Sequence, residues 1–125
     1  MPYTIKLENK VLRLALSGRI TGHDLLSVLA EAKNYETNVD VIPHRITDMS
    51  GIVELAVHYA DVSVLAEKRR ELRFPNSFKS AIIANNPQHL GYARMFQTLN
   101  DNPQITIRIF PDESAASQWI ADCGN

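Results

Sequence analysis

The chain has one cysteine, almost no net charge and no long hydrophobic run. Its single thiol, Cys123, excludes an internal disulfide and a zinc cage built from cysteines. With 13 basic and 14 acidic residues the net charge is −1, which argues against a general binder of nucleic acid or acidic membranes, because such proteins carry a basic excess. The first residues contain no apolar signal core, and the longest apolar run is too short to span a membrane. We therefore expect a cytoplasmic protein that binds no nucleic acid and does not insert into membranes.

What the chain does contain is sufficient for one globular domain. Its 125 residues are 45% hydrophobic and 22% charged, ordinary values for a domain of this length. A chain of this size buries roughly two-thirds of its unfolded surface on folding, which supports one core. No linker, repeat or low-complexity segment divides it, so we predict a single domain over residues 1–125.

Hydrophobic periodicity predicts five strands and four helices. Thr21 with Asp24 is a capping-box variant that starts the first helix, and Asp112 is a good N-cap for the last, which Trp119 and Ile120 anchor. The predicted strands cover 3–7, 12–16, 41–47, 79–84 and 105–110, and the predicted helices cover 21–34, 54–73, 88–99 and the segment from 112 onward.

The resulting order is β-β-α-β-α-β-α-β-α. Strands separated by helices must run largely parallel, with right-handed crossovers, while the opening hairpin makes the sheet mixed. We predict an α/β domain with a mixed, mostly parallel five-stranded sheet and four helices.

Five segments, through their order and spacing, carry a resemblance to a known group: Leu16-Ser17-Gly18-Arg19-Ile20-Thr21, Thr47-Asp48-Met49-Ser50-Gly51, Ala81-Ile82-Ile83-Ala84, Gly91-Tyr92-Ala93-Arg94-Met95-Phe96, and Ile109-Phe110 ahead of Ala115 and Trp119. On these segments the chain resembles the STAS fold of sulfate transporters and anti-anti-sigma factors. More narrowly, it resembles the SpoIIAA-like (STAS/SEC14-related) bacterial proteins, which are largely without assigned activity. What the resemblance implies is the fold.

The turn Asp48-Met49-Ser50-Gly51 is the first candidate site. In anti-anti-sigma proteins, a serine in an Asp-Ser-Ser-Gly-like turn at a helix N-terminus is phosphorylated, and Met49 replaces one of the two serines here. A helix N-terminus favours an anion or a phosphate, and a phosphate on Ser50 would reshape a partner surface. The alternative is that Ser50 only caps the helix and Gly51 relieves the backbone.

A second candidate lies beside the first, because the loop after the fourth strand is expected at the same sheet edge. Asn85, Asn86 and His89 belong to this loop and the start of the next helix, and Arg94 lies further along that helix. Arg94 is able to pair with an anion. The alternative is that Arg94 is an ordinary surface charge.

The predicted helix over 54–73 carries a second apolar stripe. Val57, Ala60 and Val64 lie opposite the face that we expect to contact the sheet, which indicates dimerisation or docking of a partner protein. Scattered apolar surface residues are the alternative. We expect the mixed-charge stretch 67–73 to be a solvated helix end.

Catalysis has little support in the sequence, and no motif predicts a metal or a cofactor. A triad of Ser50, His89 and Asp48 is recognised by geometry, so the sequence alone does not exclude it. Two functions remain: a STAS-type protein-interaction or regulatory module that uses the Ser50 edge, and a SEC14-like binder of a small apolar ligand or lipid. A closed core would favour the first, and an apolar cavity beneath residues 55–73 would favour the second.

Overall fold

The computed structural model describes residues 2–37 and 39–122. The single cysteine, Cys123, lies outside the described residues. The strands are β1 (Tyr3–Glu8), β2 (Val11–Thr21), β3 (His44–Ala56), β4 (Phe78–Ile83) and β5 (Ile105–Phe110); the helices are α1 (Gly22–Thr37), α2 (Tyr59–Arg70), α3 (Pro87–Leu99) and α4 (Glu113–Ala121). They form one five-stranded sheet in the order β1-β2-β3-β4-β5. Only the β1–β2 pair is antiparallel. The predicted mixed α/β architecture and element order are therefore confirmed.

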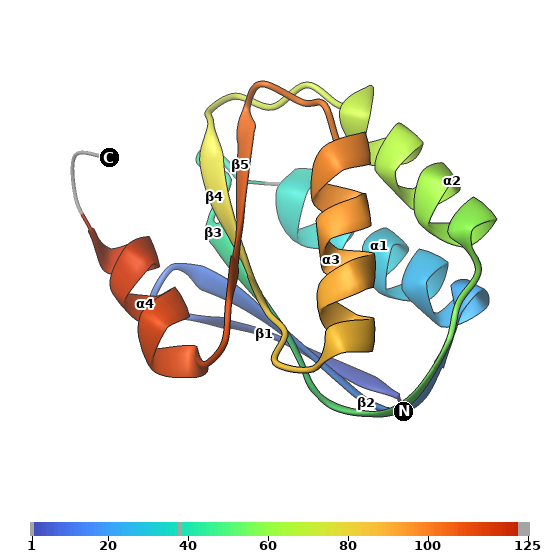
Figure 1. The fold of residues 1–125 in the computed structure, drawn as a ribbon. Helices are drawn as coiled ribbons and strands as arrows, with labels where there is room; N and C mark the ends of the chain where they lie inside the picture. Colours follow the sequence, from blue (N-terminus) through green and yellow to red (C-terminus); the bar gives the residue numbers. More distant parts are fainter. Residues whose placement is uncertain (1, 38, 123–125) are drawn as a thin grey trace.

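The helices cover the two faces of the sheet unequally (Figure 1). Helices α1, α2 and α3 pack on one face, which we call the three-helix face, and their apolar residues join β1–β5 in the larger core cluster. Helix α4 packs alone on the other face, the α4 face, where Ala116 and Ile120 meet Ile46, Ala81 and Ile83. Since both faces are covered there, β4 is buried along its whole length.

Local signals in the sequence explain the element boundaries. The β1–β2 hairpin turns through Asn9 and Lys10, both with positive φ, as a tight hairpin requires. At the start of α1, the Thr21 N–H donates to Asp24 Oδ2 over 2.8 Å, and the Asp24 N–H donates to Thr21 Oγ1 over 3.2 Å. The predicted capping box is thus confirmed. So is the N-cap of α4, where Asp112 accepts the Ala115 N–H over 2.9 Å.

The prediction of a strand over 41–47 followed by a helix from 54 is wrong, because β3 continues to Ala56. Two β-bulges explain the error. The pairing skips a residue of β3 between Asp48 and Gly51 and another between Ile52 and Glu54. Each extra residue reverses the order in which the following side chains of β3 point to the two faces of the sheet. The buried residues after Asp48 are therefore Met49, Ile52 and Leu55, a spacing of three that resembles a helix in the sequence.

Helix α2 is consequently shorter than predicted and begins at Tyr59. Its start is fixed by Asp61, whose Oδ2 accepts the backbone N–H of His58 over 2.9 Å. At its other end, the Asn102 side-chain amide donates to the Arg69 and Leu72 carbonyls, both over 2.9 Å. Tyr59, the first residue of α2, is exposed. Within the two described stretches, no helix has the length and hydropathy needed to cross a membrane.

Candidate functional site

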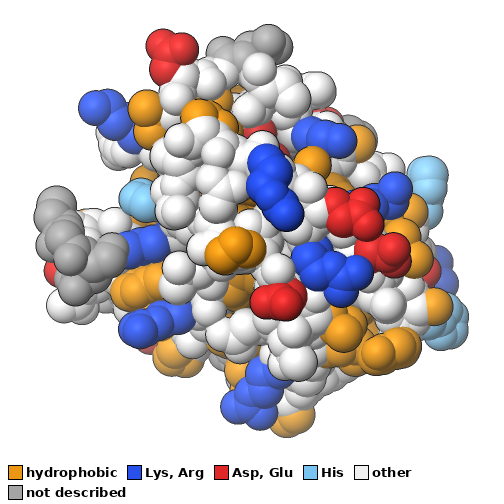
Figure 2. All heavy atoms as spheres, turned by 90° about the horizontal axis from the view of Figure 1, so that it is seen from above, with side chains coloured by type: hydrophobic (Ala, Val, Ile, Leu, Met, Phe, Trp, Pro, Cys, Tyr) orange, Lys and Arg blue, Asp and Glu red, His pale blue; other side chains and the backbone are white. Residues whose placement is uncertain are grey.

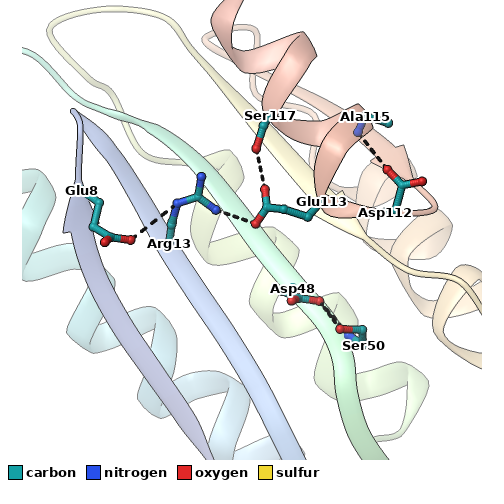
Figure 3. Close-up of polar contacts among 8 residues, drawn as sticks. All are labelled: Glu8, Arg13, Asp48, Ser50, Asp112, Glu113, Ala115 and Ser117. Carbon is teal, nitrogen blue, oxygen red and sulfur yellow. Dashed lines mark hydrogen bonds and ion pairs between the residues drawn. The ribbon is translucent and has the colours of Figure 1, made fainter.

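The structure places Ser50 inside β3, and not at a helix N-terminus. Its Oγ donates to Asp48 Oδ1 over 2.6 Å, and its backbone N–H donates to the same oxygen over 2.9 Å. Both side chains lie on the α4 face, where Arg13 of β2 reaches Glu113 at the start of α4 (Figure 3). The helix-dipole argument for a phosphate at Ser50 is therefore wrong. A phosphate on this hydroxyl would stand beside the Asp48 carboxylate, an unfavourable pairing of like charges.

Gly51 has a packing role at this point of the sheet. A Cβ on Gly51 would lie 2.8 Å from the Leu16 carbonyl oxygen of β2, closer than a carbon and an oxygen approach without a shift of backbone. Glycine therefore lets β3 lie against β2 where the first bulge falls. The predicted role of Gly51 at the start of a helix is replaced by this one.

The second candidate cluster has its own hydrogen bonds. The Asn86 Oδ1 accepts the His89 N–H over 2.9 Å and caps α3, and the Asn86 amide nitrogen lies 3.0 Å from His89 Nδ1. His89 is buried, which lowers the pKa of its imidazole. Asn85 and Arg94 are exposed. Among the described residues, no hydrogen bond joins this cluster to Asp48 or Ser50, so the structure does not assemble the Ser50–His89–Asp48 triad.

The predicted interface stripe does not exist as a single surface. Val57 is buried, because it precedes α2 and packs into the core. Ala60 and Val64 are exposed on α2. The backbone carbonyl of Val57 accepts the hydroxyl of Tyr92, which ties α3 to the segment between β3 and α2.

The structure contains a cavity of about 130 Å³ between the sheet and the helices of the three-helix face. We call it the helix-side cavity. Its floor comes from β2, β3 and β4, and its walls come from α1, α2 and α3. The lining is almost entirely apolar, and it includes Leu14, Leu29, Met49, Leu65, Ile82 and Phe96. An apolar cavity beneath α2 is the feature that favours a binder of a small apolar ligand over a closed interaction module.

Three buried charged side chains meet beside the cavity, and we call them the Glu36 cluster. Arg69 donates from Nη1 to Glu36 Oε1 over 2.8 Å and from Nη2 to Oε2 over 3.0 Å. Arg45 donates from Nη2 to Glu36 Oε2 over 2.5 Å. Arg45 and Arg69 also line the cavity. The expectation that residues 67–73 form a solvated helix end is wrong for Arg69, which is only 3% exposed.

The electrostatics of the cluster follow from its burial. Burial opposes ionisation of Glu36, but the hydrogen bonds and positive charges of Arg69 and Arg45 outweigh it and hold the pKa of Glu36 below its usual value. For Arg45, burial and the neighbouring charge of Arg69 lower the pKa to about 10, against the attraction of Glu36. The charged state of Arg45 is thus only partly compensated.

Sequence reasoning missed this cluster, although a signal was present. Glu36 follows Ala32 by four residues, and Arg69 follows Ala66 by three, so each continues a buried apolar stripe of its helix. Opposite charges at core positions of neighbouring helices predict a buried pair. The surface, unlike the buried Glu36 cluster, shows no such grouping of charges. Acidic, basic and apolar side chains are interspersed on the face seen in Figure 2.

Comparison with known proteins supports the fold and no particular activity. No protein-family model matches the chain, and no curated protein matches it. A solved structure from Shewanella loihica matches with a TM-score of 0.61 and 17% identity, over 94% of this chain and 91% of that one. It is described as an uncharacterised protein of the DUF3478 family with a SpoIIAA-like fold. The predicted SpoIIAA-like fold is confirmed.

Proposed function

We propose that this SpoIIAA-like domain binds a small, predominantly apolar molecule in the helix-side cavity, and that its role is binding without catalysis. The observation that carries the proposal is the cavity itself, with about 130 Å³ of space and an apolar lining. The cavity is partly open to solvent, so its apolar lining is exposed to water. A bound ligand would bury this apolar surface, which is favourable.

The size of the cavity restricts the ligand. An apolar cavity of about 150 Å³ binds benzene, whereas pockets for drug-sized ligands measure about 300–1,000 Å³. A ligand of roughly benzene size therefore suits the cavity. Of the two ligand types that the SEC14 resemblance suggested, a small apolar molecule fits this volume, and a lipid with a long chain would require the helices to move apart.

A titration followed by two-dimensional NMR tests the proposal, with toluene as the probe. We expect saturable shifts at cavity residues such as Met49 and Ile82. The variant Ala93→Leu places extra side chain in the cavity from α3 and should abolish these shifts. The matched control on the same helix is Gly91→Ala, because the position of its Cβ is open space.

The outcomes of this titration separate clearly. Saturable shifts that persist in a folded Ala93→Leu variant would contradict binding in the cavity, as would the absence of saturable shifts in the wild type. If Ala93→Leu does not fold, Ala93→Val serves as the smaller filling change, with weakened binding as the expected result.

The protein-interaction module is the second candidate. It is favoured by exposed apolar side chains, with Val53 of β3 87% exposed and Tyr59 and Val64 exposed on α2. Native mass spectrometry over a range of protein concentrations tests self-association. A dimer that disappears in Val64→Asp would support an interface on α2, whereas a monomer at every concentration would contradict a homodimer.

A further inference from the structure

The charges that line the helix-side cavity are all of one sign. Arg45 of β3 and Arg69 of α2 are its charged lining residues, and the carboxylate that pairs with them, Glu36, is not part of the lining. Ser80 of β4, the register partner of Arg45, also lines the cavity, as does Thr47. The cavity is therefore apolar with one polar, positively charged corner at the sheet.

The hydrogen bonds of the Glu36 cluster leave this corner incomplete. One carboxylate serves two guanidinium groups, so the buried cluster keeps one uncompensated positive charge. Arg69 takes the bidentate place on Glu36, and Arg45 reaches it only through Nη2. The Arg45 Nε is buried and has no hydrogen-bond partner within the described part of the chain. A buried donor without a partner is costly, and more so when it is charged.

We propose that the ligand of the helix-side cavity is a small monocarboxylic acid, bound as its anion with the carboxylate at Arg45 and its apolar body among the helices. This inference rests on the proposed function and adds the chemical class of the ligand. A carboxylate offers acceptors for guanidinium N–H groups, and such charge-assisted bonds are the strong ones. Its single negative charge balances the single uncompensated positive charge of the cluster. A phosphate dianion would exceed that charge and bring more polar surface into an apolar cavity.

Benzoate and benzamide form the matched pair of probes, since they share size and shape and differ in charge. In the wild-type protein we expect benzoate to bind roughly 10- to 100-fold more tightly than benzamide, the range that hydrogen bonds to a charged group provide. Isothermal titration calorimetry or NMR measures both affinities. Toluene serves as the neutral apolar reference.

The variant Arg45→Met removes the guanidinium and leaves Glu36 paired with Arg69. We expect it to lose the preference for benzoate over benzamide, a ratio of two affinities that is measured within the variant itself. Thermal unfolding confirms that the variant is folded. If it is not, Arg45→Lys keeps a charge without the planar guanidinium and should retain only part of the preference.

The failures of the two proposals are distinguishable. If none of the three probes saturates, the proposed function fails. If toluene binds but benzoate binds no more tightly than benzamide, the carboxylate inference is overturned and the cavity remains a site for neutral ligands. If the benzoate preference survives in folded Arg45→Met, Arg45 is not the partner of the carboxylate and the inference is again overturned.

Discussion

Two buried cations lie on opposite faces of the same sheet, and they differ in how completely they are accommodated. On the α4 face, Lys79 Nζ donates to the carbonyls of Trp119 and Asp122 over 2.8 and 3.0 Å and lies 5.2 Å from the centre of the Trp119 ring. On the three-helix face, Arg45 shares one carboxylate with Arg69 and keeps an unpaired Nε.

This difference shows that burial of a charge does not by itself mark a functional site. Lys79 is 7% exposed and Arg45 is 8% exposed, so the two are equally buried. Lys79 joins β4 to the end of α4, and its donors point at carbonyls that need partners. Arg45 lines an apolar cavity, and its buried Nε has no hydrogen-bond partner among the described residues. An incomplete set of hydrogen bonds beside unfilled space is the combination that indicates a ligand.

The largest expected effect follows from removing the shared carboxylate. Glu36→Ala leaves two guanidinium groups buried without their common partner, and breaking a buried pair in this way costs about 3–5 kcal/mol. Urea denaturation of wild type and variant measures the loss in the free energy of unfolding. A loss below about 1 kcal/mol would mean that water or another group already compensates the two arginines.

Removing the other cation should cost less. Lys79→Met keeps a chain of similar length against Trp119 and loses two charge-assisted hydrogen bonds, for an expected destabilisation of about 1.5–3 kcal/mol. Its benzoate and toluene affinities should equal those of the wild type, because Lys79 lies on the face without the cavity. A change in either affinity would contradict the separation of the two faces.

The pH dependence of stability should distinguish the two clusters as well. Because the pKa of Glu36 is lowered in the folded protein, its contribution is fully present above its ordinary pKa of 4.5 and is lost as the pH falls through the folded value. The stability gap between wild type and Glu36→Gln should therefore be constant from pH 7 down to about 4.5 and narrow as the pH falls further.

Lys79→Met is the control for that titration. Its gap to the wild type should not change through the carboxyl range below pH 4.5, since no carboxylate pairs with Lys79 among its hydrogen bonds. Burial and then the charge of Lys79 lower the pKa of His44, so a change in that gap is expected only at higher pH, as His44 titrates. A Glu36→Gln gap that is independent of pH would show that Glu36 does not titrate with a lowered pKa.

The smallest expected effect comes from α3, at a position that neither lines the cavity nor contacts either cation. Gly91 lies within α3 and its Cβ position is open space, so Gly91→Ala should raise stability by about 1 kcal/mol through helix propensity. Thermal unfolding measures the gain. A loss of stability would indicate that α3 needs the flexibility of glycine at this position.

Much of the fold was predictable from the sequence because its signals are local. The alternation over β1 and β2, the Thr21–Asp24 cap and the Asp112 cap each act within a few residues, and the structure contains all of them. The second half of β3 was not predictable in this way. Its two bulges depend on the pairing with β2, which lies far away in the sequence, and they give the strand a helix-like spacing.

The candidate site was harder to predict than the fold. Ser50 and Gly51 were predicted to form a functional turn, because serine and glycine are typical of such turns. In the structure they lie in a bulged strand. Arg45, Glu36 and Arg69 come from three separate elements, and only the tertiary packing brings them together. Modification of Ser50 stays a prediction. So does contact of a partner with the second cluster, which consists of Asn85, Asn86, His89 and Arg94.

The helix-side cavity is the central claim, and xenon binding in a crystal tests it most directly, because xenon enters apolar cavities of this size without needing a particular headgroup. Crystals of the full chain pressurised with xenon should show an anomalous peak between α1, α2, α3 and the sheet, near Met49 and Ile82. Diffraction that instead shows side chains filling this space, with no xenon between the helices and the sheet, would contradict the account.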